Sequence, residues 1–360
     1  MTDALNCLML PGDGIGPEII ESAETVLQSL ISIYELPVQI SHGVIGLKAL
    51  AQTGTTMPPD VEQCMRAADM IVLGPLDTMA YVPDEGGINV SAFCRTELGM
   101  FANLRPCVSL NSSALKSMDL LIVREASEGF YADRNMYRGL GEMQLTEDVA
   151  ISVRKITRQQ SERIARIAFE AARERRSHVT AVHKANNFRI TDGLFLEAVR
   201  AVATEFPDVI LSDQLVDSMA ALLVRQPEVF DVILTTNLFG DILSDLASEL
   251  SGSLGIGGGL LAGTHQCAAQ AQHGSAPDIA GTGRANPLSI LRSLALMLEW
   301  ISINRGIDQC KHASIVLETA IRTLVVDRLI LTPDLGGTAS CQEVTSAILS
   351  SLSELRETSE

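Results

Sequence analysis

The sequence lacks any hydrophobic run that could cross a membrane, although 46% of its 360 residues are apolar. A membrane-spanning helix needs about 20 consecutive apolar residues, so we expect no transmembrane segment. Residues 1–4 carry no basic group before the short apolar stretch that follows, which predicts a first strand and not a signal peptide. A chain of this length can form two domain-sized cores or one large α/β body.

The seven cysteines include no C-x-x-C pair. An odd, dispersed set of thiols indicates free cysteines in a reducing compartment, so we expect a cytoplasmic protein. Basic residues are also scarce, with 27 Lys and Arg against 44 Asp and Glu and a formal net charge of -17. This negative charge disfavours nucleic acids and anionic membranes as partners.

Short apolar runs that end abruptly in polar or glycine-rich residues predict buried strands. These runs are 5–10, 70–73, 120–123, 179–182 and 232–234. Helical patterns, such as 159–175 and 193–203, lie between them, which is typical of α/β architecture. Ligands in such folds gather beyond the carboxyl ends of strands, where these polar residues stand.

Three segments have less regular patterns. Residues 251–274 are rich in glycine and small side chains, and we expect a flexible loop beside a ligand. Residues 144–149 are expected to form a short crossing segment between domains. The turn 12–16 has the spacing G-x-G-x-G and not G-x-G-x-x-G, so it predicts a tight turn beside a ligand and matches a dinucleotide fingerprint only weakly.

Several polar residues are candidates for chemistry. Asp241 and Asp245 stand four residues apart, which on a helix places both carboxylates on one face. Such a pair is typical of a solvated helix face, and it also offers the hard oxygen ligands that Mg²⁺ prefers. A third acid, Asp217, precedes an apolar helical run. Lys184 follows a predicted strand and can serve as a base beside a metal ion, while Tyr131 alone is typical of a packed aromatic whose hydroxyl is hydrogen-bonded.

Three arginines lie next to apolar elements: Arg95, Arg105 and Arg124. Each alone is typical of an isolated ion pair. Together they can form a clamp for carboxylates, because the guanidinium group is planar and binds in a bidentate manner. An acidic protein that binds an acidic substrate needs such a local concentration of arginine.

Eight segments, in chain order, resemble the β-decarboxylating dehydrogenase family, which contains isocitrate, homoisocitrate, 3-isopropylmalate and tartrate/D-malate dehydrogenases. The segments are LPGDGIGPE, FANLRP, VREASEGFYADR, HKAN, NLFGDILSD, HGSAPDIAG, ANP and TPDLGG. The resemblance runs from Leu10 to about Gly337. Eight matches in the same order are highly specific.

The resemblance implies an α/β class and the two-domain isopropylmalate/isocitrate dehydrogenase-like fold, which is not a Rossmann fold. A central, mostly parallel sheet would lie in a discontinuous first domain. The NAD-binding domain would comprise 1–99 plus 252–360, and the dimerisation and metal/substrate domain would comprise 100–251. A homodimer with shared active sites is also implied, in which Lys184 and Asp217 act in the partner's site.

The family chemistry carries over onto matching residues. Asp217, Asp241 and Asp245 would bind Mg²⁺ or Mn²⁺, and Arg95, Arg105 and Arg124 would hold the carboxylates of a (2R)-2-hydroxy acid. The metal would acidify the 2-hydroxyl, and Lys184 would take its proton as hydride passes to NAD. Tyr131 would help to protonate the enol left by loss of CO₂.

The cofactor loop is implied in the same way. It comprises His273, Gly274, Ser275, Ala276, Asp278 and Ile279, with Asn286 as the adenine contact. A carboxylate at Asp278 accepts hydrogen bonds from ribose hydroxyls and repels a 2′-phosphate, which favours NAD over NADP. Arg284 could meet such a phosphate and leaves residual NADP use open. Asp334 is either a contact of this pocket or a turn-forming acid.

Asn89 and Ser91 precede Arg95, in the segment that sets substrate choice in the family. They would share one side if the segment is extended, but not if it is helical. Polar side chains here favour a polar substituent, as in isocitrate, homoisocitrate, tartrate or malate. The alternative is 3-isopropylmalate dehydrogenase of leucine biosynthesis, since Ile88 and Phe93 could cover an apolar substituent.

Two other classes remain. A non-catalytic regulatory subunit of a hetero-oligomeric dehydrogenase would usually have lost the lysine, the tyrosine or the metal acids, and all are present here. A dehydrogenase for a phosphorylated hydroxy acid would need clustered histidines, whereas the six histidines are dispersed.

Overall fold

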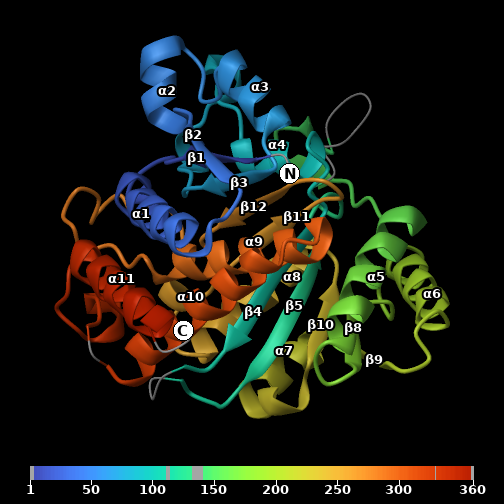
Figure 1. Cartoon of the computed structure of the whole chain (residues 1–360). Coiled ribbons are helices and arrows are strands. Elements are labelled where there is room, and N and C mark those ends of the chain that lie inside the picture. Colours follow the sequence, from blue (N-terminus) through green and yellow to red (C-terminus); the bar gives the residue numbers. More distant parts are fainter. Residues whose placement is uncertain (1–3, 111–113, 132–140, 329, 358–360) are drawn as a thin grey trace. The chain divides into compact units, whose positions relative to one another are not determined.

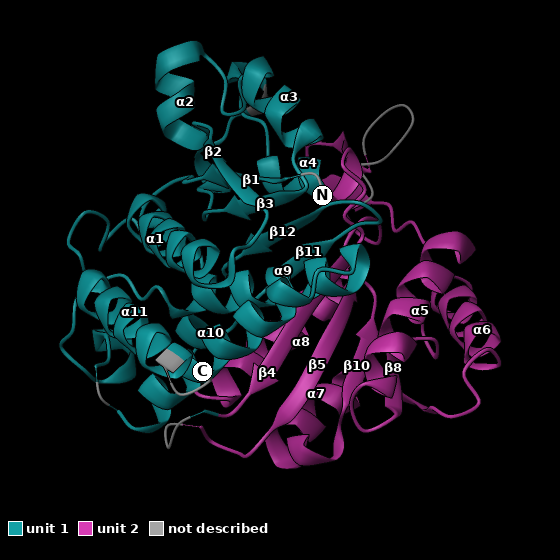
Figure 2. Ribbon diagram, viewed as in Figure 1, with its two compact units in different colours: residues 1–94, 110–112, 253–360 teal, residues 95–109, 113–252 magenta. Residues whose placement is uncertain are grey.

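The computed structural model describes residues 4–110, 114–131, 141–328 and 330–357, and Figure 1 shows its elements. The chain forms two compact units (Figure 2). One unit contains residues 1–94, 110–112 and 253–360, and the other contains residues 95–109 and 113–252. The functional division into 1–99 with 252–360 and 100–251 stays a prediction; the compact units place 95–99 and 252 with the second unit and 110–112 with the first.

The first unit is built on five strands in the order β2–β1–β3–β12–β11. Strands β2, β1, β3 and β12 are parallel, and β11 is antiparallel to β12. The elements are β1 Leu5–Leu10, α1 Gly16–Tyr34, β2 Val38–His42, α2 Gly46–Thr53, α3 Pro59–Ala67, β3 Met70–Leu73, α4 Val90–Thr96 (whose last residues belong to the second unit), β11 Leu260–Ala262, β12 Cys267–Gln270, α9 Leu288–Arg305, α10 Asp308–Val326 and α11 Cys341–Glu357.

The second unit is built on a row of five strands in the order β4–β5–β10–β8–β9, and a separate hairpin pairs β6 with β7. In the row of five, β4 is antiparallel to β5 and the other pairs are parallel, while β6 and β7 are antiparallel. The elements are β4 Ala102–Val108, β5 Asp119–Glu125, β6 Glu142–Thr146, β7 Val149–Ser152, α5 Arg158–Arg173, β8 His178–His183, α6 Thr191–Ala203, β9 Ile210–Leu215, α7 Val216–Arg225, β10 Val232–Thr235 and α8 Asn237–Leu250.

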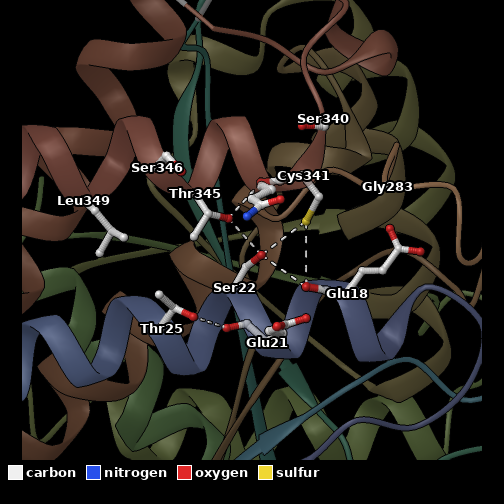
Figure 3. A pocket seen from close by; sticks show the side chains of 11 residues that line it. Glu18, Glu21, Ser22, Thr25, Gly283, Ser340, Cys341, Thr345, Ser346 and Leu349 are labelled. Carbon is white, nitrogen blue, oxygen red and sulfur yellow. Dashed lines mark hydrogen bonds between the residues drawn. The ribbon is translucent and has the colours of Figure 1, made fainter.

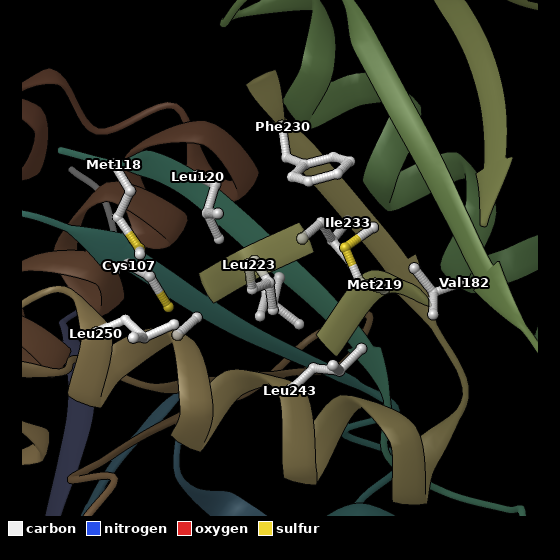
Figure 4. Close-up of a cluster of buried hydrophobic side chains, with 12 residues drawn as sticks. Cys107, Met118, Leu120, Val182, Met219, Leu223, Phe230, Ile233, Leu243 and Leu250 are labelled. Carbon is white, nitrogen blue, oxygen red and sulfur yellow. The ribbon is translucent and has the colours of Figure 1, made fainter. Parts of the chain in front are cut away.

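The core of the second unit follows from the period of its strands. Alternate strand side chains point to opposite faces. Leu120 and Ile122 of β5 therefore face the same side as Ile233 of β10. There they meet Leu223 of α7 and Leu243 of α8 (Figure 4). This packing fixes the start of α8 beside the carboxyl ends of β5 and β10.

The predicted α/β class is confirmed, and all five predicted strands form. Apolar runs 5–10 and 70–73 coincide with β1 and β3. Among the described residues, no helix combines the length and apolar character needed to cross a bilayer. Each described cysteine is a free thiol.

Two segment predictions were wrong. Residues 251–274 contain the buried strands β11 and β12, whose small side chains allow close packing against α9, and so do not form one flexible loop. Residues 144–149 belong to the antiparallel hairpin β6–β7 of the second unit. The hairpin is exposed along both strands, so its apolar side chains gave no buried-face pattern.

Candidate functional site

A polar cluster forms where β5 ends and α8 begins. Arg124, the next-to-last residue of β5, is the largest fully buried side chain among the described residues. Its Nε and Nη2 donate to Asn237 Oδ1 at 3.0 and 2.7 Å, and its Nη1 pairs with the carboxylate of Asp241. Gly240 makes this path possible, because a Cβ at that position would lie 2.6 Å from Arg124 Cγ.

Arg105 reaches the same face of α8 from strand β4. Its Nη1 donates to Asp245 Oδ1 at 2.9 Å and to Ser244 Oγ at 2.6 Å. Its Nη2 lies 3.8 Å from Asp241 Oδ1. The helical expectation for Asp241 and Asp245 is thus met: both carboxylates face the arginines, and both remain partly exposed, at 37% and 51%.

The electrostatics of this cluster favour two kinds of ligand. Burial, together with the charges of Arg95 and Arg105, lowers the pKa of Arg124 to about 9, so a bound anion would relieve the repulsion. Burial also raises the pKa of Asp245, and the nearby Asp241 adds to this effect. A cation beside the carboxylates of Asp241 and Asp245 would stabilise their charged forms. The face is therefore suited to an anion and a metal ion together.

Tyr131 contacts the same cluster, with its hydroxyl 3.4 Å from Asp241 Oδ2. It follows a turn fixed by Glu128, whose carboxylate accepts hydrogen bonds from Thr157 N at 2.7 Å and Thr157 Oγ1 at 3.0 Å. The main-chain oxygen of Glu128 accepts from Asn237 Nδ2 at 2.8 Å. Burial, and then the neighbouring Glu125, raise the pKa of Glu128 to about 7.

Lys184 and Asp217 form a separate pair. Lys184 Nζ lies 2.6 Å from Asp217 Oδ1, and the side chain of Asp217 is 62% exposed. The ion pair lowers the pKa of Asp217. Among the described residues, no three acidic, His or Cys side chains lie close enough to hold a metal ion. One chain thus brings Asp241 and Asp245 together without Asp217.

The predicted cofactor loop borders a pocket of about 520 Å³ in the first unit. The size suits part of a small-molecule ligand. Of the predicted residues, His273, Gly274, Ala276, Ile279 and Asn286 line it, together with Arg284 and Asp334. Asn286 Nδ2 donates to Asp334 Oδ2 at 2.8 Å. Asp334 is therefore both a turn-forming acid, accepting from Thr332 Oγ1 at 2.6 Å, and a pocket residue.

His273 offers a test of whether this pocket fits a cofactor. Its Nε2 is buried and has no hydrogen-bond partner among the described residues, and burial lowers its pKa. A neutral imidazole with an unsatisfied nitrogen is suited to a ligand that carries hydroxyl or amide groups. The pocket therefore fits a dinucleotide by the chemistry of its own side chains.

Two of the predicted cofactor residues do not line this pocket. Ser275 is buried, and its main-chain oxygen accepts from Ile15 N at 2.9 Å. Gly14 packs on the same oxygen, because a Cβ there would lie 1.9 Å from it. The glycine turn thus supports the cofactor loop. Asp278 is exposed on that loop.

Asn89 and Ser91 do not share one side. Asn89 Oδ1 accepts from Ala92 N at 2.9 Å, which caps the start of α4. Ser91 is buried in the helix, and its hydroxyl donates to Gln270 Oε1 at 3.1 Å. The helical alternative is the observed one, so the two side chains do not form one polar patch.

A second pocket, of about 350 Å³, lies between α1 and α11 (Figure 3). Its polar groups bond to one another: Ser22 Oγ lies 3.2 Å from Cys341 Sγ and accepts from Thr345 Oγ1 at 2.9 Å. Burial raises the pKa of the Cys341 thiol, which makes it a weak nucleophile. Glu18 accepts from Gly281 N, so this region supports the cofactor loop.

The sequence analysis missed Asn237 and Ser244. Both are fully buried and bond directly to the arginines. Ser244 could have been predicted, because it directly precedes Asp245 on the same helix. Asn237 follows a predicted strand and begins the segment NLFGDILSD, but neither feature pointed to its bond with Arg124.

The chain matches a family model described as isocitrate/isopropylmalate dehydrogenase over residues 6–348. It is 39% identical to a 3-isopropylmalate dehydrogenase of Sulfurisphaera tokodaii, covering 96% of this chain and 98% of that protein. It is 36% identical to a homoisocitrate dehydrogenase of Methanocaldococcus jannaschii, covering 95% and 96%. It also resembles the crystal structure of isocitrate dehydrogenase from Methylococcus capsulatus, with 37% identity, a TM-score of 0.84 and coverage of 97% and 99%.

Proposed function

The chain belongs to the isocitrate/isopropylmalate dehydrogenase family, and from that premise we propose that it catalyses NAD- and divalent-metal-dependent oxidative decarboxylation of a small (2R)-2-hydroxy acid with an adjacent carboxylate. The observation that carries the proposal is the meeting of Arg105, Arg124, Tyr131, Asp241 and Asp245 on one face of α8. Few arrangements offer an anion clamp, two oxygen ligands and a phenolic proton donor together.

We assign the roles by this geometry. Arg105 and Arg124, with Arg95 nearby, bind the substrate carboxylates and orient them. Asp241 and Asp245 hold the metal, which when bound supplies Lewis-acid stabilisation of negative charge on the substrate oxygens. Tyr131 is positioned by the Glu128 turn to help protonate the enol left by loss of CO₂, which gives the product.

Lys184 and Asp217 complete the site from a second subunit. The Lys184–Asp217 pair supports this assignment, because the side chain of Asp217 is 62% exposed and, among the described residues, joins no group of three acidic, His or Cys side chains that could hold a metal ion. Lys184 then accepts the proton of the substrate hydroxyl, and Asp217 adds the third oxygen ligand. The proposed assembly is therefore a homodimer with shared active sites.

Exposed apolar side chains of the second unit support dimerisation. Val224 of α7 and Ile242 of α8 are 51% and 58% exposed, and Leu145 of the β6–β7 hairpin is 57% exposed. Apolar side chains that are exposed in one chain are suited to burial in a subunit interface. A charge in this interface, Ile242→Glu, should yield monomers in light scattering and remove activity; a dimer with full activity would contradict the assignment.

The proposed cofactor is NAD. Asp334 lines the cofactor pocket beside Asn286, and Asp278 stands on the cofactor loop, so two carboxylates would repel the 2′-phosphate of NADP. Arg284 also lines the pocket, and its positive charge would attract that phosphate. Comparison of kcat/KM with NAD and NADP tests the balance, and a higher value with NADP would overturn the proposal.

For the substrate we propose a polar substituent, as in isocitrate, homoisocitrate, malate or tartrate. Phe93 is buried and packs against Arg66, whose Cζ lies 4.9 Å from the ring centre, so this ring serves the fold. Asn89 keeps an amide group at the start of α4 that suits a carboxylate. The alternative, 3-isopropylmalate, is favoured by the identity to the Sulfurisphaera tokodaii enzyme.

An NADH-formation screen tests the whole proposal. Isocitrate, homoisocitrate, 3-isopropylmalate, D-malate and tartrate are assayed with Mn²⁺ and again with a chelator. We expect chelator-sensitive NADH formation with at least one acid that carries a polar substituent. Fastest turnover of 3-isopropylmalate would select the alternative, and inactivity with all five would refute the function.

A further inference from the structure

Arg154 is a buried arginine just before α5 that no step above uses. Its side chain is only 7% exposed. Three phenylalanine rings surround its Cζ: the ring centres of Phe188, Phe239 and Phe130 lie 5.0, 5.2 and 5.5 Å away. A guanidinium over aromatic faces is attracted by their negative charge, and its burial is costly without such partners.

Its polar contacts come from two further segments. Arg154 Nη1 lies 2.6 Å from Asp192 Oδ1 and donates to Thr191 Oγ1 at 3.1 Å. Arg154 Nη2 donates to Thr236 Oγ1 at 3.2 Å. The contact with the wholly buried Asp192 is an ion pair and not a well-aligned hydrogen bond, so its strength is electrostatic.

The contact with Asp192 connects Arg154 to the Lys184–Asp217 pair. The other carboxylate oxygen of Asp192 accepts from the main-chain N–H of Lys184 at 2.6 Å. Phe188 donates from its main-chain N–H to Lys184 O at 2.8 Å. Arg154 therefore contacts Asp192 and Phe188, two of the residues that hold the main chain of Lys184, whose oxygen also accepts from Asn187 N at 3.0 Å.

The remaining contacts connect Arg154 to the cluster on α8. Thr236 directly precedes Asn237, the residue that accepts from Arg124. Phe239 lies in the first turn of α8, two residues before Asp241, and Phe130 directly precedes Tyr131. One guanidinium thus contacts the three segments that carry the proposed catalytic groups.

We propose that Arg154 is a positioning residue for both half-sites: the Lys184–Asp217 pair and the cluster on α8. The inference rests on the proposed function. In a dimer with shared sites, these half-sites of one chain belong to two different active centres, so a single Arg154 sets the geometry of both. Misplacement of a reacting group by about 1 Å can cost 10²-fold in rate.

The first experiment compares Arg154→Met and Arg154→Lys with Arg175→Met. Arg175 is a matched control, because it pairs with the buried Asp231 at 2.8 Å and with Asp119 at 2.7 Å. These contacts lie at the amino ends of β10 and β5, whereas Arg154 lies at the carboxyl ends of the strands. Using the five acids of the screen, we expect kcat to fall on the order of 10²-fold in Arg154→Met. The KM for NAD should stay constant, because the cofactor pocket lies in the other unit.

Arg154→Lys should recover part of the lost kcat, because it keeps the charge but reaches fewer partners. Arg175→Met should lower the melting temperature and leave kcat unchanged. A kcat of Arg154→Met no lower than that of Arg175→Met would overturn the inference.

The second experiment uses heterodimers purified with two tags. One chain carries Lys184→Met and the other Asp241→Asn, so that one of the two shared sites is intact. We expect about half of the wild-type rate, since one site of two remains. Adding Arg154→Met to either chain should then lower the recovered rate, because each chain gives a different half to the intact site.

The outcomes separate the two proposals. If the parent pair recovers activity and Arg154→Met acts from one chain only, or from neither, the positioning inference fails while the shared site stands. If the parent pair recovers nothing although the screen is positive, the shared site fails, and with it the claim that Arg154 serves two active centres.

Discussion

The two half-sites of the second unit differ sharply in how they are held. The cluster on α8 is cross-linked: Arg124 is 2% exposed and bonds to both Asn237 and Asp241. The Lys184–Asp217 pair has one side-chain contact at 2.6 Å, and Asp217 is 62% exposed. The first is rigid within one chain, while the second is held mainly through the main chain of Lys184.

This difference indicates a division of labour. A cluster with several fixed guanidinium groups can select and orient an anion without a partner, because its donors are organised before binding. A half-buried lysine beside an exposed aspartate is suited to meet a ligand that another subunit presents. The predictions below test this division, from the largest expected effect to the smallest.

Lys184→Met should give the largest loss. It removes the proposed base, so kcat should fall on the order of 10²–10⁴-fold. NAD binding, followed by fluorescence titration, should persist because the cofactor pocket is in the first unit. Near-normal turnover in this variant would refute the assignment of Lys184 as the base. Loss of NAD binding would mean that the Lys184–Asp217 pair also affects the cofactor pocket.

The same substitution in the two half-sites should have different consequences. Asp217→Asn and Asp241→Asn should both weaken Mn²⁺ binding, by roughly 10–100-fold if each aspartate is as important as the residues that orient metal ligands elsewhere. Only Asp241→Asn should lower the melting temperature as well, because it leaves the buried Arg124 without its carboxylate. Titration with Mn²⁺ by electron paramagnetic resonance and thermal melts measure both effects, and equal melting temperatures would contradict the comparison.

Much of the fold was predictable because apolar runs bounded by polar residues mark buried strands in any sequence. β1 and β3 were therefore placed to the residue. β11 and β12 were missed because they have only three and four residues, mostly leucine and alanine, and so carry no periodicity. The β6–β7 hairpin was missed because both of its faces are exposed in one chain.

The candidate site was predictable only in part. Asp241 and Asp245 were placed on one face by their spacing alone, and the geometry agrees. Their link to Arg105 and Arg124 came from the family resemblance and not from spacing. The role of Arg154 could not be predicted, because it contacts three segments that meet only in the folded chain.

Glu128 gives the smallest expected effect, and it concerns the cluster on α8 alone. Its carboxyl has a pKa raised from 4.5 to about 7 by burial and by Glu125. A raised pKa means that the folded protein binds the proton more tightly than the unfolded chain. The stabilisation is complete below about pH 4.5 and is lost as pH rises through about 7.

Asp217 should contribute nothing to stability changes in this window, because its pKa is lowered from 3.8. Wild type should therefore lose about 2 kcal/mol between pH 5 and 8 through Glu128, or roughly 4–8 °C in melting temperature. Glu128→Gln should flatten this slope, since it is always uncharged, while the surface control Glu205→Gln should keep it. Parallel slopes for Glu128→Gln and wild type would show that the acid beneath the cluster is already ionised, and that pH does not distinguish the two half-sites.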